Sequence, residues 1–221
     1  FAKDTDKSVW LARLAGIDVV INTVGIFRET REQSFSALHT EAPCALFAAC
    51  VEVDTVRLVV QLSALGADEH ATTAYHLSKK AADDYLAALP VASWIVQPSL
   101  IYGKDGASAR AFRVLASMPL TVRFGDAPQL VQPIHIGDVT DAFLALVRRA
   151  GSGGDASGKR VPLVGPEALP FTDYIGALRR AMGMGRQRVL RLRGAVARAL
   201  AGLGRWLPGA MLDRDALAML D

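Results

Sequence analysis

The order of three apolar segments, and of the stretches between them, constrains the fold of this chain most. The segments IDVVINTV (17–24), RLVVQLSA (57–64) and ASWIVQPSLIYG (92–103) are rich in β-branched and other apolar residues. Strands of this composition lie inside a sheet and are buried on both faces, as parallel sheets require. The sequence therefore predicts three buried strands in the first half of the chain.

Stretches with helical character separate these three segments. One covers about residues 34–53, and a second can be capped by Thr72 or Thr73 and ends near Leu89, before Pro90. Connections of this length are crossovers, which place consecutive strands parallel to one another. The pattern predicts an α/β fold with a Rossmann-like, doubly wound parallel sheet and helices on both faces.

Beyond Pro119 the pattern becomes looser. The elements expected there are a helix near 138–150, a glycine-rich linker at 151–158 and a short strand at 161–165, followed by further helices. We therefore expect a nucleotide-binding type of domain over residues 1–150 and a small, mostly helical C-terminal lobe over residues 151–221. Such sheets bind ligands at the carboxyl ends of their strands, where the lobe should pack.

A glycine-rich phosphate loop is missing from the place where this fold requires one. A dinucleotide-binding sheet carries G-x-G-x-x-G between its first strand and the next helix. GSGGDASG (151–158) follows a helix instead, and GMGRQR (183–188) lacks the third glycine and follows no strand. The chain also begins at Phe1, without methionine, and reaches a core strand almost at once. We therefore expect the N-terminal strands and the glycine loop to lie upstream of Phe1.

Two residues of the second predicted helix have the types and spacing of an acid–base pair. Tyr75 and Lys79 stand four residues apart, so they share one helical face. Reduction of a carbonyl needs an acid, and a free tyrosine, with a pKa of about 10, suits this poorly near neutrality. A nearby ammonium stabilises the phenolate and should lower that pKa. A polar helix surface can also carry such a pair by chance. The surrounding residues must therefore show whether Tyr75 and Lys79 form a functional pair.

Residues at the strand ends supply that context. Ser63 ends the second strand, where its hydroxyl either polarises a substrate carbonyl or is an ordinary strand-end serine. Asn22 and Gly25 end the first strand. The glycine permits close backbone approach to a ligand, and the asparagine either ties neighbouring strands together or contacts the ligand. Pro98 leaves the third strand without a ladder donor, which suits the floor of a cofactor site.

In this order the motifs resemble the short-chain dehydrogenase/reductase superfamily, in its extended or atypical branch. The residues within and around these motifs are similar to those of one sub-branch. This sub-branch includes NADPH-binding accessory subunits of respiratory complex I and bacterial proteins of the NAD-dependent epimerase/dehydratase type. The resemblance covers residues 1 to about 175 and rests on GIDVVINTVGIFRE, QLSALGAD, AYHLSKKAADDYL, QPSLIYG and VQPIHIGDV.

The resemblance implies a role for each of these residues. It makes residues 1–150 a partial NAD(P)-binding domain, with NADP or NAD as cofactor. Tyr75 would be the acid/base, Lys79 its activator and a ribose ligand, and Ser63 the hydroxyl that polarises the carbonyl. The residues implied to line the cofactor are Asn22, Gly25, Lys79 and Pro98.

Two functions remain open on this resemblance. One is an NAD(P)-dependent oxidoreductase or epimerase that transfers hydride at the carbonyl of an unknown small-molecule substrate. The other is a non-catalytic NAD(P)H-binding accessory or assembly factor of a membrane respiratory complex, because parts of the sub-branch bind nucleotide without known turnover. Gln97 stands where relatives often carry arginine, so any ion pair made by that arginine is absent.

The C-terminal segment is strongly basic although the net charge of the chain is only +3. Nine arginines and a single acid, Asp213, fall within residues 179–214. Residues 189–207 place leucines on one stripe of a predicted amphipathic helix. This helix either covers the small lobe or lies on an anionic membrane surface or a respiratory complex. We expect no nucleic-acid partner, since Trp206 is the one stacking ring among these arginines.

The remaining reactive residues indicate no metal site. Cys44 and Cys50 lie on different faces of their predicted helix, so neither a metal site nor a local disulfide is expected. None of the four histidines has a partner that suggests metal binding, and His135 is expected to be a hydrogen-bonded or core residue. No signal peptide or apolar run of membrane-spanning length is present. We expect a cytoplasmic protein, with peripheral association at the inner membrane face as the alternative.

Overall fold

The computed structural model describes residues 1–124 and 127–192, and the chain divides into two compact units. The sheet unit comprises residues 1–99 and 137–163, and the second unit comprises residues 100–136 and the chain from Val164. The sequence suggests a single boundary near residue 150. The observed division differs because the chain leaves the sheet unit after its third strand and later returns to add a fourth.

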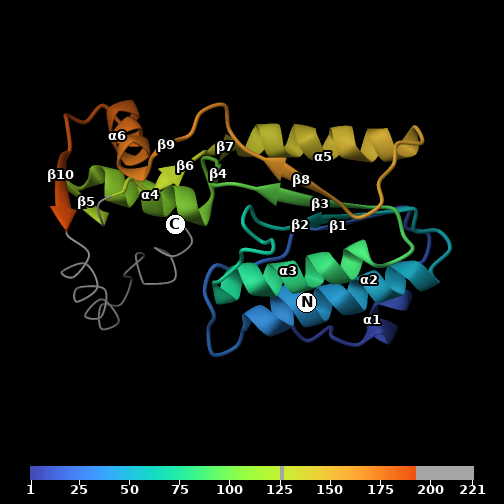
Figure 1. Ribbon diagram of the computed structural model, residues 1–221. Helices are drawn as coiled ribbons and strands as arrows, with labels where there is room; N and C mark the ends of the chain where they lie inside the picture. Colours follow the sequence, from blue (N-terminus) through green and yellow to red (C-terminus); the bar gives the residue numbers. More distant parts are fainter. Residues whose placement is uncertain (125–126, 193–221) are drawn as a thin grey trace. The chain divides into compact units, whose positions relative to one another are not determined.

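The four strands of the sheet unit are all parallel, in the order β1-β2-β3-β8 (Figure 1). Their bounds are Val19–Asn22 for β1, Leu58–Leu62 for β2, Ser93–Pro98 for β3 and Lys159–Leu163 for β8. Every residue of β3 is buried, as its apolar composition predicts. The predicted third strand is nevertheless interrupted, since β3 ends at Pro98 and a separate strand, β4, begins at Ile101.

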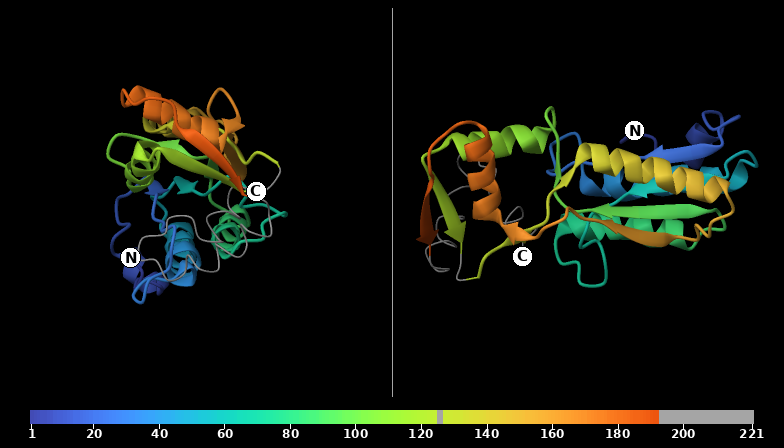
Figure 2. Two further views of the ribbon diagram at one scale, coloured as in Figure 1. Left: turned by 90° about the vertical axis from the view of Figure 1, so that its left-hand side faces the viewer. Right: turned by 90° about the horizontal axis from the view of Figure 1, so that it is seen from above.

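Helices cover both faces of this sheet, which confirms the doubly wound arrangement. A π-helical turn (Ser36–Glu41) continues into α2 (Ala42–Glu52), and α2 and α3 (Ala74–Ala87) lie on one face. The short α1 (Lys7–Leu11) packs against α2. Helix α5 (Ile136–Gly151) covers the other face, as the view from above also shows (Figure 2). The core between the sheet and α2 and α3 includes Phe47, Val59, Leu86 and Ile95.

The short strand predicted for the small lobe belongs to the main sheet, and this prediction was wrong. As β8 it pairs with β3, with Val161 opposite Val96. The predicted inter-domain linker is accordingly the loop that joins α5 to β8 within the sheet unit. Gly158 in this loop has φ +63°, and a Cβ there would lie 2.7 Å from Ala87 Cα, so the loop needs glycine for both conformation and space.

In its described residues, the second unit consists of short strand pairs and the helices α4 and α6. Its elements are β4 (Ile101–Tyr102), α4 (Ala107–Ser117), β5 (Leu120–Phe124), β6 (Leu130–Val131), β7 (Ile134–His135), β9 (Leu169–Pro170), α6 (Phe171–Ala181) and β10 (Arg188–Leu192). Strand β4 pairs with β7, β5 with β10 and β6 with β9. A small core of Ala116, Val131, Phe171, Tyr174 and Ile175 holds the unit together.

The predicted C-terminal helix does not begin where the sequence suggests. Residues 188–192 form β10, parallel to β5, so a helix starting at residue 189 was wrong. The segment VLRLR suits a strand as well as a helix, and pairing with β5 satisfies its backbone groups. The rest of the predicted helix, residues 193–207, lies outside the described residues.

Candidate functional site

The carboxyl ends of β1, β2 and β3 meet at one edge of the sheet. Parallel strands place these ends together, and sheets of this type bind ligands there. The backbone N–H of Ser63, just after β2, donates to the carbonyl of Val96 at 2.7 Å. The N–H of Leu65 donates to the carbonyl of Pro98 at 2.9 Å. The chain segments that leave β2 and β3 are therefore held side by side at the edge where the sequence predicts the site.

Helix α3 presents three polar side chains toward this edge. The helix begins after Thr73, whose hydroxyl accepts a hydrogen bond from the N–H of His76, as the capping prediction required. Tyr75, Lys79 and Asp83 follow at intervals of four residues and are 9%, 4% and 0% exposed. The prediction that Tyr75 and Lys79 share one helical face is confirmed, and the same face continues to a buried carboxylate.

Lys79 joins the ends of two strands. Its Nζ donates to the carbonyl of Val24 at 3.1 Å and to that of Leu62 at 3.2 Å. An ammonium has three N–H donors, so one remains for a further acceptor. Burial lowers the pKa of Lys79 to about 8, although the charge of Asp83 acts in the opposite direction.

Gly25 makes room for this ammonium. A Cβ at position 25 would lie 3.0 Å from Lys79 Nζ, closer than an ordinary contact. The sequence predicts that the glycine allows close approach to the backbone. In the structure the group that approaches is the Lys79 side chain, which belongs to the candidate site itself.

Tyr75 is enclosed by aromatic rings. Phe27 stacks on it with ring centroids 5.7 Å apart, and Phe35, His39 and His76 contact it edge-on. Burial, followed by the charge of Asp83, raises the pKa of Tyr75 to about 12. The predicted lowering of this pKa by Lys79 is therefore wrong for this arrangement, because the ammonium is directed at the strand-end carbonyls.

Ser63 is bound to a carboxylate that sequence reasoning missed. Its hydroxyl donates to Oδ2 of Asp83, and both side chains are buried. Burial raises the pKa of Asp83 to about 7, while the Ser63 hydrogen bond and the charges of Lys79 and Arg160 oppose the shift. Asp83 Oδ1 has no hydrogen-bond partner among the described residues. The signal that could have found Asp83 is its spacing, eight residues after Tyr75 and four after Lys79.

Asn22 ties neighbouring strands together, one of the two roles that the sequence left open. Its Nδ2 donates to Oε1 of Gln61 at 2.8 Å, across the β1–β2 pair. Its Oδ1 accepts from the N–H of Val24 at 3.2 Å. Asn22 therefore fixes the backbone of Val24, whose carbonyl in turn binds Lys79.

His39 is a second residue of the site to which the sequence gave no role. It is fully buried, and its Nε2 accepts from the N–H of Ile26 at 3.0 Å. The proton therefore resides on Nδ1, which lies 2.9 Å from Ser78 Oγ and donates to it. Ser78 Oγ donates in turn to the carbonyl of Tyr75 at 2.7 Å. Burial, followed by the charge of Lys79, lowers the pKa of His39 to about 3, so the ring is neutral.

Gln97 is the departure from the family pattern, and it has a structural task. The side chain is buried, and its Nε2 donates to the carbonyl of Ala67 at 3.1 Å. It thereby holds the loop that follows β2 against β3. Pro98, the next residue, is buried at the end of β3.

The hydrogen bonds described for this cluster involve neither of the two cysteines, nor His135. Among the described residues, no group of three or more histidine, cysteine or acidic side chains is placed to hold a metal ion. Cys44 and Cys50 are free thiols whose pKa values burial raises to about 11. His135 lies in β7 of the second unit, edge-on to Tyr102.

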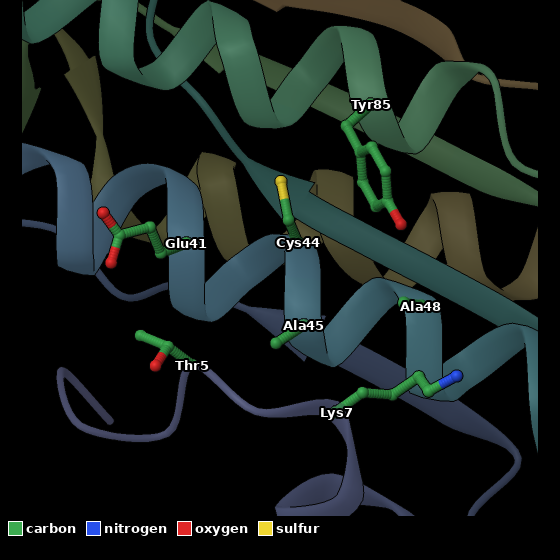
Figure 3. Close-up of a pocket in the computed structure, with 7 residues that line it drawn as sticks. All are labelled: Thr5, Lys7, Glu41, Cys44, Ala45, Ala48 and Tyr85. Carbon is green, nitrogen blue, oxygen red and sulfur yellow. The ribbon is translucent and has the colours of Figure 1, made fainter.

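A hollow on the helical layer of the sheet unit contains none of the predicted site residues. It is lined by the N-terminal segment, α2 and α3 (Figure 3), through Thr5, Lys7, Glu41, Cys44, Ala45, Ala48 and Tyr85. Lys7 in this hollow is paired with Glu52. The hollow is open and lies on the helices, away from the strand ends, so we assign the candidate site to the buried cluster at the sheet edge.

Comparison with known proteins finds a related mitochondrial protein. The chain matches no known protein-family model. It is 28% identical over 169 residues to NADH dehydrogenase [ubiquinone] 1 alpha subcomplex subunit 9, mitochondrial, of Arabidopsis thaliana. The match covers 74% of this chain and 40% of that protein, so the chain spans about two fifths of the length of this relative.

Solved structures share the fold at low sequence identity. UDP-glucuronic acid 4-epimerase from Bacillus cereus, in complex with NAD, has a TM-score of 0.68 at 18% identity over 86% of this chain and 67% of that chain. dTDP-4-dehydrorhamnose reductase from Bacillus anthracis, in complex with NADP, has a TM-score of 0.70 at 13% identity over 88% and 73%. The fold is therefore that of Rossmann-type NAD(P)-binding proteins. Together with the sequence relative, these likenesses support the resemblance to the extended short-chain dehydrogenase/reductase branch.

Proposed function

We propose that this chain carries the cofactor and catalytic edge of an NAD(P)-dependent oxidoreductase or epimerase that acts at the carbonyl of a small molecule. The observation that carries the proposal is Lys79, a buried ammonium that has one N–H donor left and lies beside Gly25, where no side chain intervenes. A ribose hydroxyl is an acceptor that suits such a donor. Similar structures that contain NAD or NADP support this choice of cofactor.

The residues present fit one ribose of a dinucleotide, and each has a task in the proposed reaction. Gly25, Lys79 and Pro98 would hold the cofactor, with Asn22 fixing the backbone that binds Lys79. The cofactor supplies hydride to the carbonyl carbon when it is bound. Tyr75 donates its phenolic proton to the developing alkoxide.

Ser63 polarises the substrate carbonyl in this proposal, which requires a change in its hydrogen bond. The single hydroxyl proton of Ser63 is donated to Asp83 in the structure. A protonated Asp83 can donate to Ser63 instead, and that exchange frees the serine proton for a carbonyl oxygen. The polarising role of Ser63 therefore requires the protonated form of Asp83, and a pKa of about 7 means that both the protonated form and the carboxylate are present near neutral pH.

Substitution of the proposed acid tests this function. NADPH and NADH oxidation by the full-length protein should be measured with a panel of small carbonyl compounds and quinones. Tyr75→Phe should lower turnover by a factor of about 100 or more, because it removes the proton donor, with little change in nucleotide affinity. Tyr85→Phe, on the exposed side of the same helix, is the matched control and should retain turnover. Turnover that survives in Tyr75→Phe would contradict the proposal.

A second candidate function is a non-catalytic NAD(P)H-binding accessory or assembly factor of a membrane respiratory complex. The enclosure of Tyr75 by Phe27, with its raised pKa, favours this candidate over an efficient acid. So does the sequence relative, which is named as a subunit of NADH dehydrogenase. Nucleotide binding without turnover in both the parent protein and Tyr75→Phe would support it.

Association with a membrane or a respiratory complex belongs to this second candidate. The arginine-rich segment from residue 189 would provide the contact, at the inner face of the membrane. None of the helices in the described part of the chain is long and apolar enough to cross a membrane.

A further inference from the structure

Lys79 and Asp83 are the two buried side chains among the described lysines, arginines, aspartates and glutamates. They lie one helical turn apart on the inward face of α3. The structure does not bring them into a direct ion pair. Lys79 Nζ donates to two carbonyls, while Asp83 Oδ2 accepts from Ser63. The two charges therefore act on each other through the protein interior, where they are poorly screened.

The charge of Lys79 decides whether it can bind a ligand at all. An ammonium has three N–H donors, and a neutral amine has two. The carbonyls of Val24 and Leu62 already occupy two. Loss of the proton from Lys79 removes the third donor, so only the charged form can donate to a nucleotide hydroxyl while it holds the two strand ends.

We propose that Asp83 is a positioning residue of the nucleotide site, whose carboxylate keeps Lys79 in its charged, ligand-binding form. This inference rests on the proposed nucleotide site and extends it by one residue. The unpartnered Oδ1 supports it, because an unpaired buried carboxylate oxygen is costly unless a nearby positive charge compensates. No other acidic side chain among the described residues is buried to play this part.

The charged and titratable groups around Asp83 come from three elements. Helix α3 contributes Lys79, Tyr75 and Asp84, whose charge raises the pKa of Asp83 slightly. Strand β8 contributes Arg160, whose charge lowers it. His39, from the π-helical turn, feels the charge of Lys79 and is neutral. Lys79 is therefore the proposed nucleotide-binding group on which the charge of Asp83 acts.

The expected sign of the effect is as follows. Burial lowers the pKa of Lys79 to about 8, and the negative charge of Asp83 prevents a larger fall. Removing that charge lowers the Lys79 pKa further, so nucleotide binding is lost at a lower pH. Because the pKa of Asp83 is about 7, its carboxylate is mostly protonated at pH 6, and removing it there should have little effect.

The test is the pH profile of NADPH affinity for the full-length protein, measured by fluorescence titration from about pH 6 to about pH 9. Asp83→Asn keeps the size of the side chain and an oxygen that accepts from Ser63. We expect its alkaline limb to move down by about one pH unit, with about fivefold weaker binding at pH 8, about tenfold weaker binding near pH 9 and unchanged binding at pH 6. Asp84→Asn, at the next position but exposed, is the matched control and should move the profile far less, because the charge of Asp84 is the smallest influence on the pKa of Asp83.

Two further measurements keep the inference falsifiable. Asp83→Glu restores the charge and should return the alkaline limb toward that of the parent protein. The pKa of Lys79 can also be followed without nucleotide, by NMR of its labelled ε-carbon. If the parent protein binds no NADPH, the proposed function fails, and the NMR titration still decides the role of Asp83. An unchanged Lys79 pKa in Asp83→Asn, or coincident binding profiles, overturns the inference.

Discussion

Helix α3 carries similar side chains on two faces, and the two faces behave differently. The inward face presents Tyr75, Lys79 and Asp83, and the row one position later presents His76, Lys80 and Asp84. Lys80 and Asp84 form an ion pair, with side chains that are 30% and 46% exposed. Such pairs contribute about 0.3–0.5 kcal/mol on a helix surface.

The inward lysine and aspartate have the same spacing but do not pair. Each binds a strand end or a strand-end hydroxyl instead, and burial shifts both of their pKa values toward neutrality. Identical sequence spacing thus gives a solvated ion pair on one face and a pair of titratable groups on the other. Burial against the strand ends, and not the spacing, makes the inward row chemically distinctive.

The largest effect expected from the inward face is on the pH dependence of stability, and it concerns His39, which packs against Tyr75 on this face. Its pKa of about 3 means that the unfolded chain takes up a proton before the folded protein as the pH falls from about 6.5. The free energy of unfolding should therefore decrease by about 1.4 kcal/mol per pH unit on account of this residue. Urea denaturation between about pH 6.5 and about pH 4 measures this loss.

His39→Gln should remove this contribution to the pH dependence, because glutamine cannot titrate. His70→Gln replaces an exposed histidine and serves as the control, with the pH dependence of the parent protein expected. An acid stability profile that is the same in His39→Gln and the parent protein would show that His39 is not held neutral by its burial.

The next largest effect compares the two lysines directly. Lys79→Met removes the donor to the Val24 and Leu62 carbonyls and should weaken NADPH binding by a factor of about 100 or more. Lys80→Met removes a surface ion pair and should change the affinity by less than about twofold. The measurement is a nucleotide titration, with circular dichroism to confirm that both variants fold. Equal losses in the two variants would break the distinction between the two faces.

The smallest effect concerns the space beside the ammonium. Gly25→Ala would place a methyl group 3.0 Å from Lys79 Nζ and force the lysine to shift by a few tenths of an ångström. We expect NADPH affinity to fall about fivefold, with stability nearly unchanged, because the flexible end of the side chain can move. Gly185→Ala, where a Cβ meets no atom within 4 Å, is the control. An unaltered affinity in Gly25→Ala would show that Lys79 can bind nucleotide from a shifted position.

The sequence carries enough information to predict the sheet and the helical face of the site, but not the partners within it. Runs of β-branched residues identify β1, β2 and β3, because burial on both faces leaves a local pattern. Strand β8 was misplaced because pairing with β3 depends on residues far away along the chain. The spacing of Tyr75 and Lys79 is local, so their position on one helical face could be predicted from the sequence. The hydrogen bonds of Lys79 to strand-end carbonyls, which leave the Tyr75 pKa raised, depend on tertiary packing.

Ser63 shows the same limit in a single residue. Its position at the end of β2 was predicted, because strand ends can be located from sequence. The partner that takes its proton, Asp83, lies on the next helix, and nothing in the local sequence around Ser63 indicates the contact. Extending the four-residue spacing from Tyr75 by one more turn would have found it.

The path of the chain has a consequence for folding. Strand β3 is completed on one side only when β8 arrives, after residues 100–136 have entered the second unit and α5 has formed. During synthesis, the edge of β3 that later pairs with β8 therefore stays unpaired for longer than the edges that join β1 to β2 and β2 to β3. Such edges pair readily with other chains, and contacts between distant segments form slowly. A chain that ends before residue 159 would leave the fully buried strand β3 with an unpaired edge that other chains can reach.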